Sequence, residues 1–192
     1  MLWVAVFALM KPPVIFSSGL FGGMPASMYS NVLNDIRTNF TVVDAPIACS
    51  RRDYDTLCDK LNMDKVPFIA HSSINLDVLK SRRMRSAFLI DPASVPALSF
   101  NGLEQANVES PCPIRVVQSK LYESFVPTKF QPRFSEVICE IFDGAGHSDV
   151  LDSPWAATGE FAGIPSEADM RIEYRDFIKR SIRKWLLDKS DV

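Results

Sequence analysis

Short apolar runs recur along the chain, separated by stretches in which apolar residues return every three or four positions. The runs are rich in β-branched and aromatic residues, and proline, glycine, aspartate or serine stands near their ends, which is typical of strands. The predicted strands are Val4–Leu9, Val14–Ser17, Phe40–Asp44, Val66–Ala70, Ala87–Ile90, Ile114–Val117 and Val137–Phe142. Most are continuously apolar without strict alternation, which favours a parallel sheet covered on both faces.

The amphipathic stretches between the strands predict helices. Their ranges are Pro25–Thr38, Tyr54–Met63, Leu76–Arg83 and Glu167–Leu187. One face of the first carries Tyr29, Val32, Leu33 and Ile36, and one stripe of the last carries Ile172, Phe177, Ile178, Ile182 and Trp185. Alternating strands and helices predict an α/β fold with right-handed crossovers, and the length of 192 residues predicts one domain over residues 1–192.

Composition narrows the function classes. Hydrophobic residues make up 47% and charged residues 23%, as in a folded globular protein, and a net charge of −2 gives no electrostatic case for nucleic acid. The apolar stretch Leu2–Met10 is too short to span a bilayer and lacks the basic flank and cleavage site of a signal peptide. We therefore expect a cytoplasmic protein with no integral membrane segment.

The four cysteines show no CxxC spacing and no grouping with histidine. This argues against a zinc site or a disulfide framework and favours scattered buried thiols. We expect no metal and no other cofactor. The sequence gives no indication of the oligomeric state.

Three loops after predicted strands carry the candidate chemistry, because ligands of open parallel sheets bind outside the carboxyl ends of the strands. The first is Ser17–Gly23, which contains Gly19, Gly22 and Gly23. Three interpretations are open: a phosphate loop, which lacks the Lys-Ser/Thr of a Walker motif; an oxyanion loop that donates a backbone N–H; or an ordinary strand-to-helix turn.

The second loop follows Val66–Ala70 and reads Ala70-His71-Ser72-Ser73-Ile74. A nucleophile elbow has the pattern Gly-x-Ser-x-Gly, because the turn from strand to helix leaves room only for small residues two positions before and after the serine. Ala70 is small, but Ile74 is a β-branched residue where glycine is expected. The stretch is therefore either an altered elbow or a polar strand end.

The third loop, Asp143–Asp149, follows the last predicted strand and contains His147. It is either a surface turn or the loop of a catalytic base. The chain has two histidines, and His71 adjoins the serine, so a serine–histidine hydrolase would use His147 as its base. Glycine loop, serine and late histidine follow one another in the chain order of an α/β-hydrolase.

Several of these segments resemble α/β-hydrolases of the chlorophyllase and dienelactone-hydrolase-like group. PPVIFSSGLFGGMPASMYSNVLNDIRTNFTVVDAP looks like their opening strand, oxyanion loop, helix and strand. FIAHSS resembles their Gly-His-Ser elbow, AFLIDPAS their Ile-Asp-Pro segment, and DGAGHSDVLD their histidine loop. The resemblance covers about residues 12–155. This chain departs from the group at Ser18, where histidine is usual, at Ile74, and in lacking the insertions that form a cap.

The resemblance implies an α/β-hydrolase fold with a mostly parallel sheet of about six or seven strands and helices on both faces. It also implies that the protein acts on a small-molecule ester. The implied catalytic residues are Ser72 as nucleophile, His147 as base and Asp91 as acid, with Glu123 as an alternative acid after the next strand. The implied oxyanion donors are the backbone N–H groups of Leu20 and Ser73, and the implied substrate contacts are Gly19, Phe21 and His71.

Two functional hypotheses follow. The first is a serine esterase for an apolar ester, with chlorophyll suggested by the resemblance. The second is a catalytically degenerate hydrolase fold that serves as a binding or scaffold protein, motivated by Ile74 and the missing cap. The separation between Ser72 and His147 distinguishes them, because a base must come within hydrogen-bond reach of the group it deprotonates.

Overall fold

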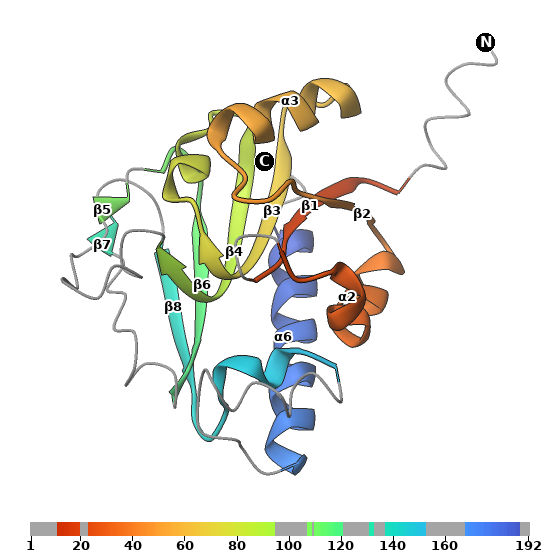
Figure 1. The fold of residues 1–192 in the computed structure, drawn as a ribbon, viewed down its shortest axis with the longest axis vertical. Coiled ribbons are helices and arrows are strands. Elements are labelled where there is room, and N and C mark those ends of the chain that lie inside the picture. Colours follow the sequence, from red (N-terminus) through yellow and green to blue (C-terminus); the bar gives the residue numbers. More distant parts are fainter. Residues whose placement is uncertain are drawn as a thin grey trace.

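The computed structural model describes residues 11–19, 23–94, 107–108, 110–120, 131–132, 137–152 and 168–188. Six strands form one parallel sheet in the order β2-β1-β3-β4-β6-β8 (Figure 1). These strands are β1 (Pro13–Ser17), β2 (Thr41–Asp44), β3 (Val66–Ile74), β4 (Met84–Ser94), β6 (Ile114–Ser119) and β8 (Val137–Phe142). A separate parallel pair is formed by β5 (Asn107–Val108) and β7 (Gln131–Pro132). The predicted strand Val4–Leu9 lies outside the described residues.

The strand order places a topological switch point beside β1. The chain passes from β1 to β2 on one side, and then returns to add β3, β4, β6 and β8 on the other side. The loops that leave the carboxyl ends of β1 and β3 therefore flank the position where open α/β sheets bind their ligands. The glycine motif begins in the loop after β1, and Ser72 lies near the carboxyl end of β3.

The helical segments are η2 (Ala26–Tyr29), α2 (Ser30–Arg37), α3 (Arg51–Leu61), η3 (Leu76–Lys80), η5 (His147–Val150) and α6 (Ala168–Asp188), where η marks a 3-10 helix. Helix α3 begins at a capping box in which the Ser50 side chain accepts from the Asp53 N–H and the Asp53 side chain accepts from the Ser50 N–H. It ends at Asn62, which adopts the left-handed conformation with φ 52°.

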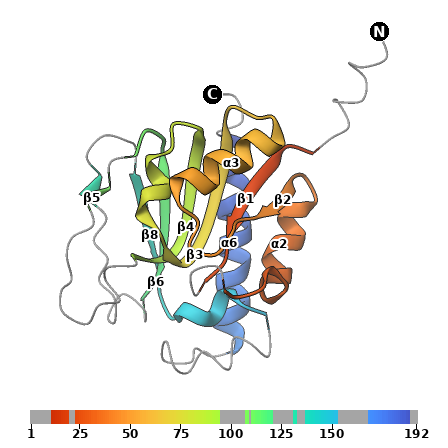
Figure 2. The same cartoon turned by 45° about the horizontal axis from the view of Figure 1, so that its top comes forward.

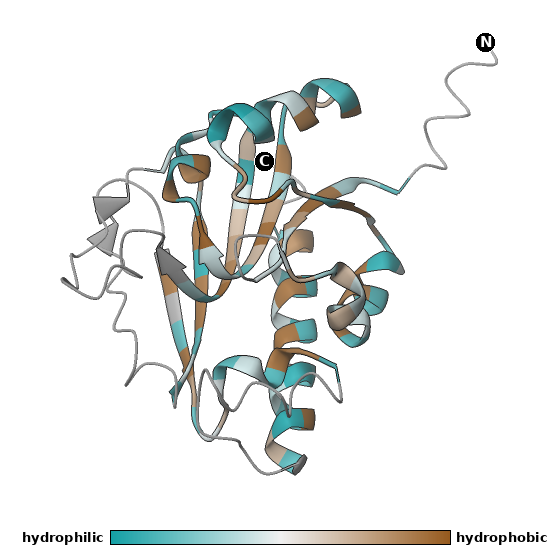
Figure 3. Ribbon diagram, viewed as in Figure 1, coloured by the Kyte–Doolittle hydropathy of each residue, from teal (hydrophilic) through white to brown (hydrophobic). Residues whose placement is uncertain are grey.

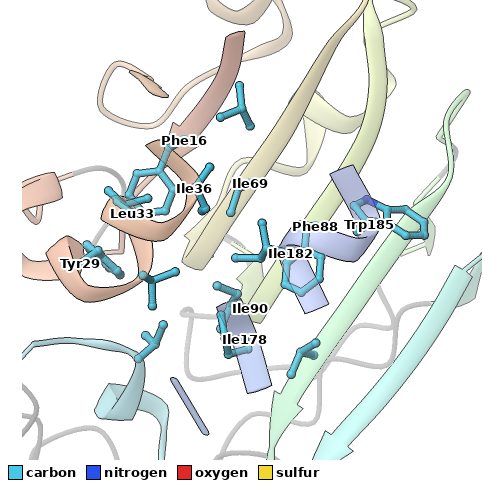
Figure 4. Close-up of a cluster of buried hydrophobic side chains, with 14 of the residues drawn as sticks. Phe16, Tyr29, Leu33, Ile36, Ile69, Phe88, Ile90, Ile178, Ile182 and Trp185 are labelled. Carbon is cyan, nitrogen blue, oxygen red and sulfur yellow. The ribbon is translucent and has the colours of Figure 1, made fainter. Parts of the chain in front are cut away.

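Helices cover both faces of the sheet, and alternate strand residues enter two separate cores. Phe16, Ile69 and Ile90 belong to one core, which is completed by α2 and α6 (Figure 4). Phe68 and Leu89 point to the other core, under α3 and η3. Figure 2 shows α3 and α6 on opposite sides of the sheet, and Figure 3 shows how apolar the central strands are. The continuous apolar runs in the sequence reflect this burial on both faces.

The fold class predicted from the sequence is confirmed in its layers and its strand directions. The described sheet has six parallel strands with helices on both faces, as expected for an α/β fold. The division of the chain into one domain over residues 1–192 stays a prediction. Within the described ranges, no helix is long and apolar enough to cross a membrane.

Some element predictions were wrong in detail. The predicted helix Leu76–Arg83 is the 3-10 helix η3, and the predicted helix Pro25–Thr38 is divided into η2 and α2. On α6, Ile172 is 55% exposed and does not belong to the buried stripe, whereas Tyr174 is fully buried there. Tyr174 continues the stripe of Ile178 and Ile182 at four-residue spacing, so the helical period was right and one of its members was misplaced.

Candidate active site

A β-bulge between β3 and β4 brings Ser72 and Asp91 to the same level of the sheet. His71 pairs with Ile90 and Ser73 pairs with Ala93, so one residue on β3 faces two on β4. Ser72 has φ 62° and Asp91 has φ 43°, both in the left-handed region that residues other than glycine rarely adopt. Such strained residues concentrate at functional sites, and bulges re-aim side chains beside them.

The same bulge accounts for Ile74. The chain does not turn into a helix after Ser72, but stays paired with β4 through Ile74 before η3 begins. The Ile74 side chain is 2% exposed and packs in the core under α3 and η3. The tight strand-to-helix turn expected of a nucleophile elbow is therefore absent here, and with it the steric need for glycine at this position.

His147 begins η5, directly after the loop that follows β8. Its Nε2 lies 2.8 Å from Ser72 Oγ, within hydrogen-bond distance. Gly144 in the same loop has φ 80°, and the Met170 side chain of α6 occupies the space that a Cβ would need. The Asp149 carboxylate accepts from the Gly146 N–H at 2.6 Å. These contacts fix the loop that presents His147 to Ser72.

Asp91 lies on the other side of the His147 ring. Its Oδ2 is 3.6 Å from His147 Nδ1, which is longer than a hydrogen bond. Asp91 is fully buried, and Ser119 at the end of β6 donates to it from its backbone N–H at 2.5 Å and its hydroxyl at 2.9 Å. The Tyr174 hydroxyl donates to Asp91 Oδ2 at 3.4 Å. Glu123, the alternative acid, lies outside the described residues.

His71 is buried beside these residues, and both its ring nitrogens have partners within the protein. Its Nδ1 lies 2.8 Å from the Tyr29 hydroxyl and its Nε2 lies 3.1 Å from the backbone oxygen of His147. The two imidazole rings stack with centroids 4.7 Å apart. Burial, together with the neighbouring His147, holds the pKa of His71 well below its usual value.

The glycine loop approaches the same place from β1. The Gly19 N–H donates to the Tyr29 hydroxyl at 2.8 Å, so this N–H is already engaged. The Ser18 hydroxyl donates to the Met24 carbonyl at 2.5 Å and helps to close the loop. Leu20 and Phe21 lie outside the described residues. Ser73, the other predicted oxyanion donor, is buried directly after Ser72.

His71, Asp91 and His147 form the only group of potential metal ligands in the described part of the chain, with ligand atoms within 4.8 Å of one another. All three already have hydrogen-bond partners within the protein: His147 contacts Ser72, His71 contacts the His147 backbone oxygen, and Asp91 accepts from Ser119. A cation held by His71 would have to displace its contact with either Tyr29 or the His147 carbonyl. The arrangement therefore suits proton transfer better than coordination.

Three residues that contact the site were not predicted to do so from the sequence. Ser119 stands just beyond the predicted strand Ile114–Val117, and its position as a polar residue at the carboxyl end of a strand was the available signal. Tyr174 shares the buried stripe of α6, and Tyr29 was assigned only to an apolar helix face. A buried tyrosine hydroxyl needs a polar partner, and this requirement was the available signal.

Comparisons with known proteins leave the chain without an assigned family. No family model and no curated protein matches it. One solved structure aligns over 89% of this chain and 92% of that chain, with a TM-score of 0.47 and 9% sequence identity. It comes from work on carboxylesterases of the ammonia-oxidizing thaumarchaeon Nitrososphaera gargenis. A likeness at this level does not transfer an activity, so the functional case rests on the geometry around Ser72.

Proposed function

We propose that the protein is a serine hydrolase that cleaves a carboxylic ester through an acyl-enzyme. The observation that carries this proposal is the 2.8 Å contact between Ser72 Oγ and His147 Nε2, made by a serine held at φ 62° on the bulge of β3. A serine is a weak nucleophile until an adjacent base accepts its proton, and His147 lies where that base is needed.

In the proposed reaction, His147 takes the proton of Ser72 as the oxygen attacks the ester carbonyl. His147 then gives this proton to the leaving alcohol. In the second half-reaction His147 deprotonates the water that attacks the acyl-enzyme and returns that proton to Ser72 Oγ as the acyl group leaves. Asp91, 3.6 Å from Nδ1, fixes the orientation of the ring and stabilises its protonated form. The backbone N–H groups of Leu20 and Ser73 are the proposed donors to the oxyanion.

The proposed substrate is an apolar ester, with the phytyl ester of chlorophyll as the specific candidate. The support is the resemblance of the segments around Ser72, Asp91 and His147 to chlorophyllases. In that case the products are chlorophyllide and phytol. The scaffold hypothesis predicts a Ser72–His147 separation far beyond about 3 Å, because proton transfer needs hydrogen-bond reach, and the observed 2.8 Å does not favour it.

The test is reaction of the folded protein with a fluorophosphonate probe, followed by assays of p-nitrophenyl esters of increasing acyl length and of chlorophyll. We expect the probe to label Ser72, and the Ser72→Ala and His147→Ala variants to lose several orders of magnitude in rate. The matched control is Ser86→Ala, a fully buried serine near the opposite end of β4 from Asp91, which should retain activity. Folded protein whose Ser72 stays unlabelled would refute the proposal.

A further inference from the structure

A chain of hydrogen bonds joins the glycine loop, strand β3 and the loop that carries His147. It begins at the Gly19 N–H, after β1, which donates to the Tyr29 hydroxyl at 2.8 Å. It continues from Tyr29 to His71 Nδ1 on β3 at 2.8 Å, and from His71 Nε2 to the backbone oxygen of His147 at 3.1 Å. All of its side-chain atoms are buried: Tyr29 is 1% and His71 is 2% exposed.

The partners assign a donor and an acceptor to every bond. A carbonyl oxygen can only accept, so His71 must carry its proton on Nε2. The neutral ring then has a lone pair on Nδ1, which accepts the proton of the Tyr29 hydroxyl, whose oxygen in turn accepts from Gly19. Burial lowers the pKa of His71 and raises the pKa of Tyr29, which keeps the imidazole neutral and the phenol protonated.

We propose that Tyr29 and His71 are positioning residues that fix the His147 loop against the glycine loop. This inference rests on the proposed serine hydrolase function. The bond to the His147 carbonyl acts on the backbone of the proposed base, and the bond to Gly19 acts on the residue before Leu20, the proposed oxyanion donor. His71, suggested from the sequence as a substrate contact, is thereby assigned a role within the protein framework.

The packing around Gly19 supports this role. A Cβ at this position would lie 3.1 Å from the Tyr29 hydroxyl and 3.2 Å from His71 Nδ1, tighter than ordinary contacts. The glycine thus lets the loop backbone come close to the Tyr29–His71 pair. The stacking of His71 on His147 adds a second constraint, and a neutral His71 does not oppose the positive charge that His147 acquires during the reaction.

The kinetic test compares two tyrosine variants. Tyr29→Phe removes the central link of the chain, whereas Tyr54→Phe removes an equally buried hydroxyl that donates to the Val66 carbonyl at 2.5 Å in the other core. We expect Tyr29→Phe to lower kcat and the rate of fluorophosphonate labelling about 10- to 100-fold with little change in KM, as misplacement of catalytic groups does. Tyr54→Phe should reduce the melting temperature similarly and leave kcat unchanged.

Two His71 variants test the two hydrogen bonds of its ring separately. His71→Gln places an amide nitrogen near the position of Nε2 and can keep the bond to the His147 carbonyl, whereas His71→Asn places its amide near Nδ1 and can keep only the bond to Tyr29. We therefore expect His71→Gln to retain more kcat than His71→Asn. Adding Tyr29→Phe to His71→Asn should cost little more, because the chain is already broken.

A nuclear magnetic resonance measurement tests whether this chain of hydrogen bonds exists, independently of any enzymatic activity. With two histidines in the protein, the ring nitrogen signals can be assigned by comparison with a His71 variant. We expect His71 at neutral pH as the neutral tautomer protonated on Nε2, and we expect the His147 ring signals to shift in Tyr29→Phe but not in Tyr54→Phe. A His71 protonated on Nδ1 would overturn the inference even if the enzyme is active.

The two proposals fail in different ways. Wild-type protein that is not labelled at Ser72 contradicts the proposed function, and the His71 tautomer and His147 shifts still decide whether the chain of bonds exists. Wild-type protein that is labelled, together with Tyr29→Phe protein that is labelled equally fast, contradicts the positioning role alone. Equal losses of kcat in Tyr29→Phe and Tyr54→Phe would also contradict it, because the effect would then be one of general stability.

Discussion

Replacing Ile74 by glycine tests the interpretation of the bulge directly. If Ile74 obstructed a conventional elbow, glycine would relieve the obstruction and raise activity. The structure instead places the Ile74 side chain, 2% exposed, in the core under α3 and η3. We therefore expect Ile74→Gly to destabilise the protein and to leave the reactivity of Ser72 no higher than in the wild type.

The size of the loss follows from burial. Truncating a fully buried isoleucine to alanine costs about 2–5 kcal/mol, and glycine in a strand costs about 0.5–1 kcal/mol more than alanine. The expected loss in the free energy of unfolding is thus about 2.5–6 kcal/mol, which lowers the melting temperature of a chain of this length by about 5–24 °C. Ile74→Val should cost about 1 kcal/mol.

Urea denaturation gives the change in unfolding free energy, and fluorophosphonate labelling below the melting transition gives the reactivity of Ser72. The matched control is Ile47→Gly, at an isoleucine that is 70% exposed, where we expect a loss of about 1 kcal/mol or less. A several-fold rise in labelling for Ile74→Gly would refute the reasoning, and so would a stability loss no larger than that of the control.

Three further predictions concern the acid, its support and the buried imidazole. Asp91→Asn should lower kcat about 10⁴-fold in the ester assay, as expected when the orienting carboxylate of a triad is lost, whereas Glu123→Gln should leave kcat nearly unchanged; the opposite result would make Glu123 the acid. Tyr174→Phe removes a 3.4 Å hydrogen bond to Asp91, and it should reduce kcat only modestly and the free energy of unfolding by about 1 kcal/mol. We expect small effects because the two hydrogen bonds from Ser119 still hold the Asp91 carboxylate, and a loss of kcat as large as that of Asp91→Asn would contradict this. The folded-state pKa of His71 lies below the unfolded value of 6.5, so below about pH 6.5 the unfolded state binds a proton that the folded state does not. The contribution of His71 to stability is therefore complete above about pH 6.5. As the pH falls below this value, the free energy of unfolding decreases by at most about 1.4 kcal/mol per pH unit from this group. Urea titrations from pH 7 to about 5 should show this slope in wild type and a flatter one in His71→Gln, and an unchanged slope would contradict it.

The layers of the fold could be predicted because the strands are buried on both faces and their apolar runs are continuous. The ends of the strands could not, because β3 and β4 extend through polar residues. His71, Ser72 and Ser73 do not read as strand, yet pairing with β4 keeps them in the sheet. The short helix η3 follows from this extension, since the chain leaves β3 later than the apolar pattern suggests and has few residues left before β4 begins.

The candidate site was predictable in its principal residues and not in its supports. Ser72 and His147 stand out because each follows a strand at the same edge of the sheet, and the chain offers few histidines. Ser119 and Tyr29 act through contacts with residues far away in the sequence, and no local pattern reports such contacts. Whether a polar atom is buried, and so needs a partner within the protein, depends on the tertiary arrangement of the elements that cover it.

The bulge changes which sequence constraints hold Ser72, the proposed nucleophile, in its conformation. In an elbow, the positive φ of the serine is imposed by a tight turn, so the residues two positions away must be small. In this protein the neighbouring strand β4 imposes the positive φ, because the pairing of β3 with β4 before and after Ser72 fixes the backbone. The additional residue on β4 places Asp91 beside Ser72. The constraint therefore moves from the flanks of the serine to the Asp91–Pro92 step of β4. It follows that a large residue at position 74 is compatible with the site, while changes in the length of β4 around Asp91 are not.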